Sequence, residues 1–159
     1  MGLPATFDLS QDPLERVREL LIRTTTALEL DATISVEERE GGIWASVEGG
    51  ELERFIGKRG QTIDAVQLLA RQIANLGAQE RRSVTVDASG YRERRANALC
   101  RQAERAASDA LKTGEPVELI PMPAFERRIV HTHLADRAEI DTYSVGDDPD
   151  RCVVISPLR

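Results

Sequence analysis

The sequence is poor in aromatic residues, cysteine and histidine, and it lacks a long apolar run. Only 4% of its 159 residues are aromatic, and it holds two cysteines and two histidines. Cys100 and Cys152 lie too far apart, and are too few, for a disulfide framework, so we expect two buried thiols. No apolar stretch approaches the roughly 18 residues of a membrane-spanning helix, and the N-terminus lacks the order of a signal peptide. These absences favour a folded cytoplasmic protein.

Patterns typical of metal sites and catalysis are also missing. His131 and His133 are two residues apart on a predicted helix, where their side chains diverge by about 200° and cannot share one ion. The acidic turn 147–150 lacks the alternating ligands and glycine of a calcium loop, so we interpret it as a solvated hairpin turn. Neither a nucleophile elbow nor a zinc-protease pattern occurs. We therefore expect no enzyme, no metal and no cofactor; a nuclease would need a metal-binding carboxylate cluster.

Charge is distributed unevenly along the chain. The net charge is −6, but residues 1–53 carry −8, residues 54–105 carry +6 and residues 106–159 carry −4. A cationic middle between acidic segments favours local binding of nucleic acid while the overall field opposes non-specific adhesion. The alternative is that these charges form ordinary solvated faces.

A Gly-x-x-Gly loop, Gly57-Lys58-Arg59-Gly60, opens the cationic segment. Without a Cβ atom at either glycine, the main chain can turn sharply and a nucleic-acid backbone can approach it closely. The N–H groups that open the following helix can then face a phosphate, while the lysine and arginine supply the countercharge. A nucleotide-hydrolase phosphate loop does not fit, because Leu52 stands where that motif requires glycine.

Apolar residues flank this loop, with Ile56 before it and Ile63 after it. Together they predict a groove with an apolar floor and a cationic lip, as single-stranded RNA requires for its unstacked bases and its backbone. A plain connection between two helices remains the alternative interpretation.

Apolar periodicity predicts an α+β first domain. We expect a helix over 13–30, a hairpin of strands near 32–36 and 43–47, a short helical segment before the loop, a helix to about residue 76, and a strand over 83–87. The helix after the loop should bury Ile63, Val66, Leu69, Ala70 and Ile73. One antiparallel sheet with helices on one face satisfies this order.

A second, smaller α+β unit is expected to follow. Its predicted elements are a long helix over 90–111, a short strand over 117–120, a helix over 124–136, and strands over 140–145 and 152–156. The domain boundaries are accordingly predicted as a tail over 1–11, a first domain over 12–88 and a second over 89–159, which begins with the long helix.

Two further features are candidates for binding. Arg127 and His131 lie four residues apart and share one helix face, where they could grip a phosphate or a base edge together with Arg128. The alternative is an ordinary solvated face. Trp44 alternates out of register with its apolar neighbours, so it should lie on the opposite sheet face, either as a partner surface or covered by the tail around Phe7.

These motifs, in this order, resemble bacterial Jag-type (SpoIIIJ-associated) proteins, in which a KH domain precedes an R-three-H domain. Ile56-Gly57-Lys58-Arg59-Gly60, followed by residues 62–67, looks like the KH signature, and the order of elements is similar to a type II KH fold. The stretch 121–131 resembles the R-three-H motif, which is named for an arginine and a histidine separated by three residues.

The resemblance implies a single-stranded RNA-binding regulatory protein linked to cell elongation and division, and association with a small KH-only protein. Single-stranded DNA is a further possible ligand. The alternative is a protein–protein adaptor with weak or vestigial nucleic-acid binding. The RNA-binding residues implied by the resemblance are Gly57, Lys58, Arg59, Gly60, Arg127 and His131, and the apolar and cationic patterns above add Ile56, Ile63 and Arg128.

Overall fold

The structure is a computed structural model that describes residues 12–39 and 41–158. These residues form a mixed α+β protein, which confirms the expected class, and the chain divides into two compact units between Tyr91 and Arg92. Among the helices of the described ranges, none is both long and apolar enough to cross a membrane. Each unit is described by itself below.

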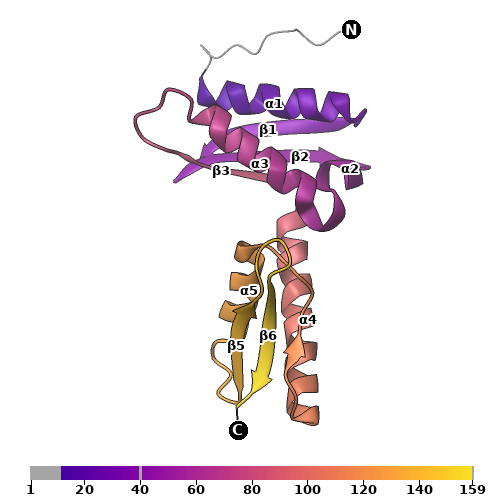
Figure 1. Ribbon diagram of the computed structural model, residues 1–159. Helices are drawn as coiled ribbons and strands as arrows, with labels where there is room; N and C mark the ends of the chain where they lie inside the picture. Colours follow the sequence, from indigo (N-terminus) through magenta and orange to yellow (C-terminus); the bar gives the residue numbers. More distant parts are fainter. Residues whose placement is uncertain (1–11, 40, 159) are drawn as a thin grey trace. The chain divides into compact units, whose positions relative to one another are not determined.

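The first unit follows the predicted order of elements (Figure 1). The elements are α1 (Pro13–Ala27), β1 (Ala32–Arg39), β2 (Gly42–Gly49), α2 (Glu53–Ile56), the 3-10 turn η1 (Lys58–Gly60), α3 (Gln61–Ala74) and β3 (Ser83–Ala88). Proline at the first position of α1 fits a helix start, because that position needs no N–H donor.

The sheet of this unit has the order β1-β2-β3 and is mixed. Strands β1 and β2 form the expected antiparallel hairpin, but β2 and β3 are parallel, so the prediction of one antiparallel sheet is wrong. The reason lies in the connection: α2, η1 and α3 together form a crossover that carries the chain back along the sheet. A strand that follows such a crossover runs in the same direction as the strand before it.

Helices α1 and α3 cover one face of this sheet (Figure 1). Alternate residues of β2 point into the core, and Ile43, Ala45 and Val47 are buried. Trp44 lies on the opposite face, half-buried, with the Arg39 guanidinium 4.6 Å from its ring centre. The expected side of Trp44 is thus observed, while the tail around Phe7 lies outside the described residues.

The buried stripe of α3 differs from the expected one at Ile73, which is only partly buried, and at Leu69. This side chain is 52% exposed, whereas Ile63, Val66, Ala70 and Ala74 are buried. At 100° per residue, Leu69 lies about 100° from the centre of the stripe that these four residues form, so its side chain is on the outer side of the helix.

The second unit contains a three-stranded antiparallel sheet of order β4-β6-β5. Its elements are α4 (Tyr91–Thr113), whose first residue still belongs to the first unit, β4 (Val117–Glu118), α5 (Ala124–Leu134), β5 (Ile140–Val145) and β6 (Cys152–Pro157). Leu99, Ala103 and Ala107 of α4 pack with Val130 of α5 and Ile155 of β6 in a separate core.

The two cysteines are free thiols. Cys152 is buried in β6, as expected, while Cys100 on α4 is only partly buried. The Cys152 Sγ lies 3.2 Å from Glu118 Oε1 on the neighbouring strand. Burial first, and this carboxylate second, raise the pKa of the Cys152 thiol, so it stays protonated at neutral pH.

Candidate nucleic-acid interface

The Gly-x-x-Gly loop joins α2 to α3 through backbone conformations that only glycine adopts easily. Gly57 has φ 73° and ψ 177°, a region that is almost exclusive to glycine, and Gly60 has φ 83° and ψ 8°. Arg59 is also left-handed, with φ 55°. The side chains of Lys58 and Arg59, between the two glycines, are exposed.

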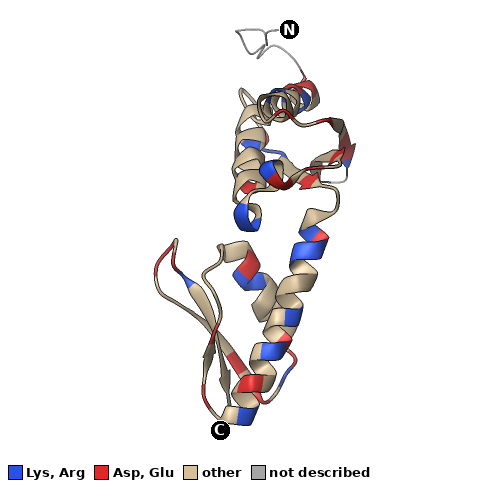
Figure 2. Ribbon diagram, turned by 90° about the vertical axis from the view of Figure 1, so that its right-hand side faces the viewer, with Lys and Arg blue, Asp and Glu red and all other residues tan. Residues whose placement is uncertain are grey.

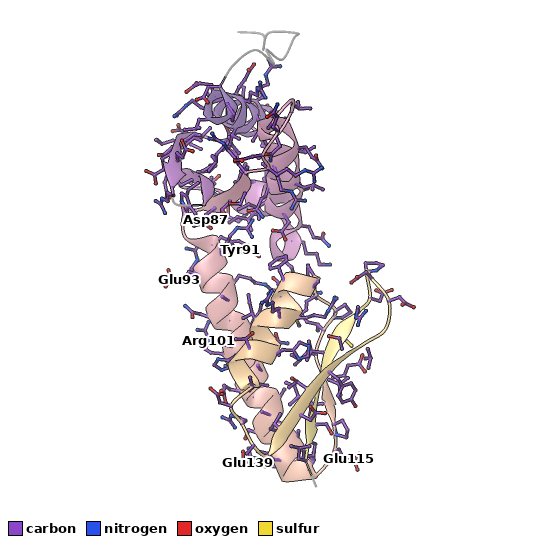
Figure 3. The ribbon with its side chains drawn as sticks, turned by 90° about the vertical axis from the view of Figure 1, so that its left-hand side faces the viewer. Asp87, Tyr91, Glu93, Arg101, Glu115 and Glu139 are labelled. Atoms are coloured by element: carbon purple, nitrogen blue, oxygen red, sulfur yellow. The ribbon has the colours of Figure 1, made fainter. Side chains whose placement is uncertain are left out.

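Close packing fixes this loop from two sides. A Cβ atom on Gly57 would lie 2.1 Å from Thr62 Oγ1 and 2.9 Å from the Thr62 backbone nitrogen. A Cβ atom on Gly60 would lie 2.6 Å from the phenol oxygen of Tyr91, the residue that begins α4 (Figure 3). The main chain therefore comes closer to its neighbours than any residue with a side chain would allow, which preorganises the loop.

The start of α3 supplies a fixed partial positive charge at the same place. Gly60 is the N-cap of this 14-residue helix and has no side chain that could bond the first N–H groups. Such groups and the helix dipole favour an anion. With Lys58 and Arg59 exposed beside them, the loop can bind a phosphate group.

The apolar residues around the loop divide into supports and surface. Phe55 and Ile63 are fully buried in the core of the first unit. Ile63 therefore cannot form part of a base-contacting floor as expected; it anchors α3 beneath the loop. Ile56 is only partly buried, so it is the expected apolar residue that reaches the surface beside Gly57.

Arg127 of the second unit is buried, contrary to a role in gripping phosphate. Its Nη1 atom donates to the Met122 carbonyl oxygen at 2.8 Å and to Asp148 Oδ1 at 3.0 Å. The side chain ties the start of α5 to the segment before it and to the β5–β6 loop. Arg128, one residue further along the helix, is exposed.

His131 is also engaged inside the unit. Its Nδ1 atom lies 2.8 Å from Thr142 Oγ1 and its Nε2 atom 3.1 Å from Ser144 Oγ, so both ring nitrogens bridge α5 to β5. Burial, and then the nearby charge of Arg127, lower the pKa of His131, against a smaller raising effect of Asp141. The imidazole is therefore neutral at neutral pH. Arg127 and His131 share a helix side, but each is already held by other protein groups.

Phe125 is a surface residue that the sequence patterns did not single out. It is 47% exposed and lies three residues before Arg128, which places an aromatic ring and a guanidinium on one face of α5. No sequence signal marked it, because the inward stripe of α5 contains two charged residues and is recognised only from the observed burial of Glu126, Arg127, Val130 and Leu134.

Further ion pairs also shape this unit. Arg95 of α4 holds the buried Glu126 with two hydrogen bonds of 2.7 and 2.8 Å. His133 contacts Glu104 at 2.8 Å, and Arg137 binds the same carboxylate. Within residues 12–39 and 41–158, no three histidine, cysteine or acidic side chains gather as metal ligands.

Comparison with known proteins gives a family match and several relatives. Residues 97–157 match the R-three-H domain. The chain is 34% identical over 150 residues to RNA-binding protein KhpB of Bacillus subtilis (strain 168), a match that covers 93% of this chain and 72% of the relative. It is 38% identical to the KhpB of Lactiplantibacillus plantarum and 35% identical to that of Clostridium symbiosum.

These matches cover very different shares of the relatives. The chain spans 40% of the Lactiplantibacillus protein and 66% of the Clostridium protein, while 80% and 91% of this chain are covered in turn. The R-three-H match includes α5, where the Arg-x-x-x-His motif lies, and the similarity to KhpB extends over nearly all of the chain. The chain therefore belongs to the KhpB family, the Jag-type proteins that its motifs resemble.

Proposed function

We propose that this chain is a regulatory protein that binds single-stranded RNA, with the Gly57–Gly60 loop as its main backbone contact. The main support for this proposal is the preorganised loop, which has two glycines at positive φ, two exposed cations between them, and the start of α3 beside them. The name of the relatives, RNA-binding protein KhpB, supports the same ligand.

The first unit is proposed to be a type II KH domain, over residues 12–88. Its helix-strand-strand-helix-helix-strand order supports this assignment. Residues 89–159 would form the R-three-H domain with its leading long helix. The compact units divide three residues later than this boundary, after Tyr91.

In this proposal the loop clamps the RNA backbone and leaves the bases accessible. KH loops hold about four nucleotides by their backbone. Lys58 and Arg59 neutralise phosphates, the N–H groups at the start of α3 face a phosphate oxygen, and Ile56 offers apolar contact to an unstacked base. Ile63 acts from below, by fixing the position of α3.

The second unit would contribute through Phe125 and Arg128 of α5. An exposed aromatic ring can stack on a base, and an adjacent guanidinium can pair with the phosphate that follows it. Arg127 and His131 are assigned positioning roles, because their polar atoms bind Met122, Asp148, Thr142 and Ser144.

The broader role follows the family and remains part of the proposal. We propose that the protein is cytoplasmic and has no enzymatic activity, that it takes part in the control of cell elongation and division, and that it associates with a small KH-only protein. Single-stranded DNA is proposed as a further ligand. In the alternative, the protein is an adaptor that binds other proteins, and its RNA binding is vestigial.

The test measures affinity for a single-stranded RNA of about four nucleotides. Lys58→Gln/Arg59→Gln removes two positive charges from the loop. Thr33→Glu/Gln79→Glu is the matched control: both positions are exposed in the first unit, and the net charge changes by the same amount. Each lost phosphate contact makes the slope of log affinity against log salt concentration less steep by about 0.7. The loss of two contacts therefore corresponds to about 25-fold weaker binding at 0.1 M salt.

We expect that loss for the loop variant and a much smaller one for the control. Equal losses would assign the effect to the general field of the protein and remove the loop from the mechanism. If neither the wild type nor any variant binds RNA, at low or at high salt, the result would favour the adaptor alternative.

A further inference from the structure

Helix α4 carries a straight row of cations that neither motif includes. Arg94, Arg101, Arg105 and Lys112 follow one another at intervals of seven, four and seven residues. At 100° per residue, these spacings place all four within about 20° of one line along the helix. We call this row the basic ridge; blue segments recur along α4 in Figure 2, and Arg101 is labelled in Figure 3.

The basic ridge faces away from the core of the second unit. The buried residues of α4 are Leu99, Ala103, Ala106, Ala107 and Ala110, which lie on the opposite side of the helix. All four ridge residues are exposed. Because the apolar seam is already packed, the ridge is a surface with no internal packing role.

Three cations of the basic ridge are not neutralised within the unit. Across the described part of the chain, Arg101, Arg105 and Lys112 form no ion pair, while the acidic Glu104 of the same helix is occupied by Arg137 and His133. Arg101 and Arg105 lie four residues apart, a spacing at which like charges destabilise a helix. A protein of net charge −6 thus keeps a like-charged row on one helix face.

We propose that the basic ridge is a second sugar-phosphate contact for single-stranded RNA, separate from the Gly57–Gly60 loop. The inference rests on the proposed RNA-binding function and adds a site to it. About eighteen residues of helix separate the first and last cations, which is about 27 Å. Such a row follows an extended backbone and takes a longer strand than the loop alone.

The surroundings of the basic ridge favour this ligand over a membrane surface. Asn97, Ala98 and Ser108 flank the row, and Asp109 borders it. The exposed Leu111 lies about 100° away around the helix. A helix that binds in a lipid interface needs a large apolar face beside its cations, and the apolar side of α4 is buried. Regularly spaced cations without large apolar neighbours match a phosphate backbone.

The test compares two RNA lengths on the full chain. The probes are a uridine oligomer of about four nucleotides, the length held by a KH loop, and a polyuridine several times longer. Arg101→Gln/Arg105→Gln removes two ridge charges, Thr33→Glu/Gln79→Glu again matches the net charge, and Arg101→Lys/Arg105→Lys keeps the charge while removing the guanidinium groups. Lys58→Gln/Arg59→Gln reports on the loop in parallel.

We expect the ridge variant to bind the short oligomer as the wild type does, and the long strand about 25-fold more weakly at 0.1 M salt. The slope of its log affinity against log salt concentration should be less steep by about 1.4. The lines for the ridge variant and the wild type should therefore converge near about 1 M salt. The lysine variant should retain most of the affinity.

Four results would overturn the inference. If the ridge variant binds the long strand as the wild type does, the basic ridge is not an RNA contact, while the proposal for the loop still stands. A loss no larger than that of the charge-matched control would reduce it to a field effect. Charge-dependent capture of vesicles of phosphatidylserine and phosphatidylcholine, without any effect on RNA, would identify a lipid surface instead. If the wild type binds RNA of neither length, both the inference and the proposed function are wrong.

Discussion

At position 57 the backbone conformation and the neighbouring side chain both require glycine. The φ of 73° combines with ψ 177°, and a Cβ atom would overlap Thr62 Oγ1 at 2.1 Å. We predict that Gly57→Ala lowers the free energy of unfolding of the first unit by about 3 kcal/mol, through backbone strain and the shift of α3 needed to relieve the overlap. Urea unfolding followed by Trp44 fluorescence measures this loss.

Gly77 provides the matched control. Its φ of 72° is nearly the same, but nothing lies within 4 Å of the position of a Cβ atom. Gly77→Ala should therefore cost only the left-handed conformation, about 1 kcal/mol. Similar losses for both variants would show that steric contact with Thr62 does not fix the loop.

The neutral state of His131 predicts a dependence of stability on pH. Burial and Arg127 hold its pKa below the ordinary 6.5. As the pH falls below 6.5, the unfolded chain takes up a proton before the folded one does, so the unfolded state becomes relatively more favourable. The stabilisation from His131 is thus fully present above pH 6.5 and is lost as the pH falls toward the folded-state pKa.

His131→Asn isolates this effect from the carboxylates, which titrate in both proteins. The difference in unfolding free energy between wild type and variant should be constant above pH 6.5 and shrink below it. A difference that grew in acid would mean that the folded protein prefers the imidazolium, which would make His131 a candidate cation for RNA.

At the scale of a single helix, α5 separates two neighbouring arginines into different roles. Arg127 is buried and holds the Met122 carbonyl, whereas Arg128 is exposed. We predict that Arg127→Met destabilises the second unit by about 2 kcal/mol, because a charged hydrogen bond is lost and a carbonyl is left without its donor. Amide hydrogen exchange resolved by residue measures this loss in α5 and β6.

Arg128→Met should show the opposite pattern. Its effect on stability should stay within about 0.5 kcal/mol, since an exposed side chain is replaced. RNA affinity should fall about fivefold at 0.1 M salt, as expected for one phosphate contact. A larger affinity loss in a folded Arg127→Met protein would return that residue to the binding surface.

The sequence predicted the kinds of element well and the inward faces of the helices less well. The alternation of β-branched and polar residues predicts a strand over 140–145, which matches the observed limits of β5. On α5, however, the inward stripe contains Glu126 and Arg127, and their partners Arg95 and Asp148 lie 31 and 21 residues away. Charged residues on a helix are typical of a solvated face, and only tertiary contacts reveal that these two are paired and buried.

The candidate site shows the same division between local and long-range information. The two glycines and the two cations of the loop lie where the spacing predicted, because turn geometry is a local property. The burial of Ile63 follows from the apolar spacing of α3, as predicted. The contact of Gly60 with Tyr91 depends on how the start of α4 packs, which no local pattern encodes. The predicted helix 90–111 already contains Arg94, Arg101 and Arg105, and the observed end of α4 at Thr113 adds Lys112 to their row.

For the whole molecule, two separate hydrophobic cores predict two separable unfolding transitions. Phe55 is fully buried in the first core and Leu99 in the second, and the two cores share no residue. The single tryptophan, Trp44, lies in the first unit, so its fluorescence reports on that unit, while far-ultraviolet circular dichroism reports on both.

Leu99→Ala should lower the stability of the second unit by about 3 kcal/mol through the cavity it leaves. We expect the circular dichroism curve in urea to become biphasic while the Trp44 transition keeps its midpoint. Phe55→Ala is the reciprocal variant: it should shift the Trp44 transition by a similar amount and leave the second phase in place. The effects of the double variant should be additive because the two side chains belong to separate cores. If Leu99→Ala moved the fluorescence midpoint as far as it moved the dichroism midpoint, the units would unfold as one cooperative body, and the ridge and the loop would have to be treated as parts of a single energetic unit.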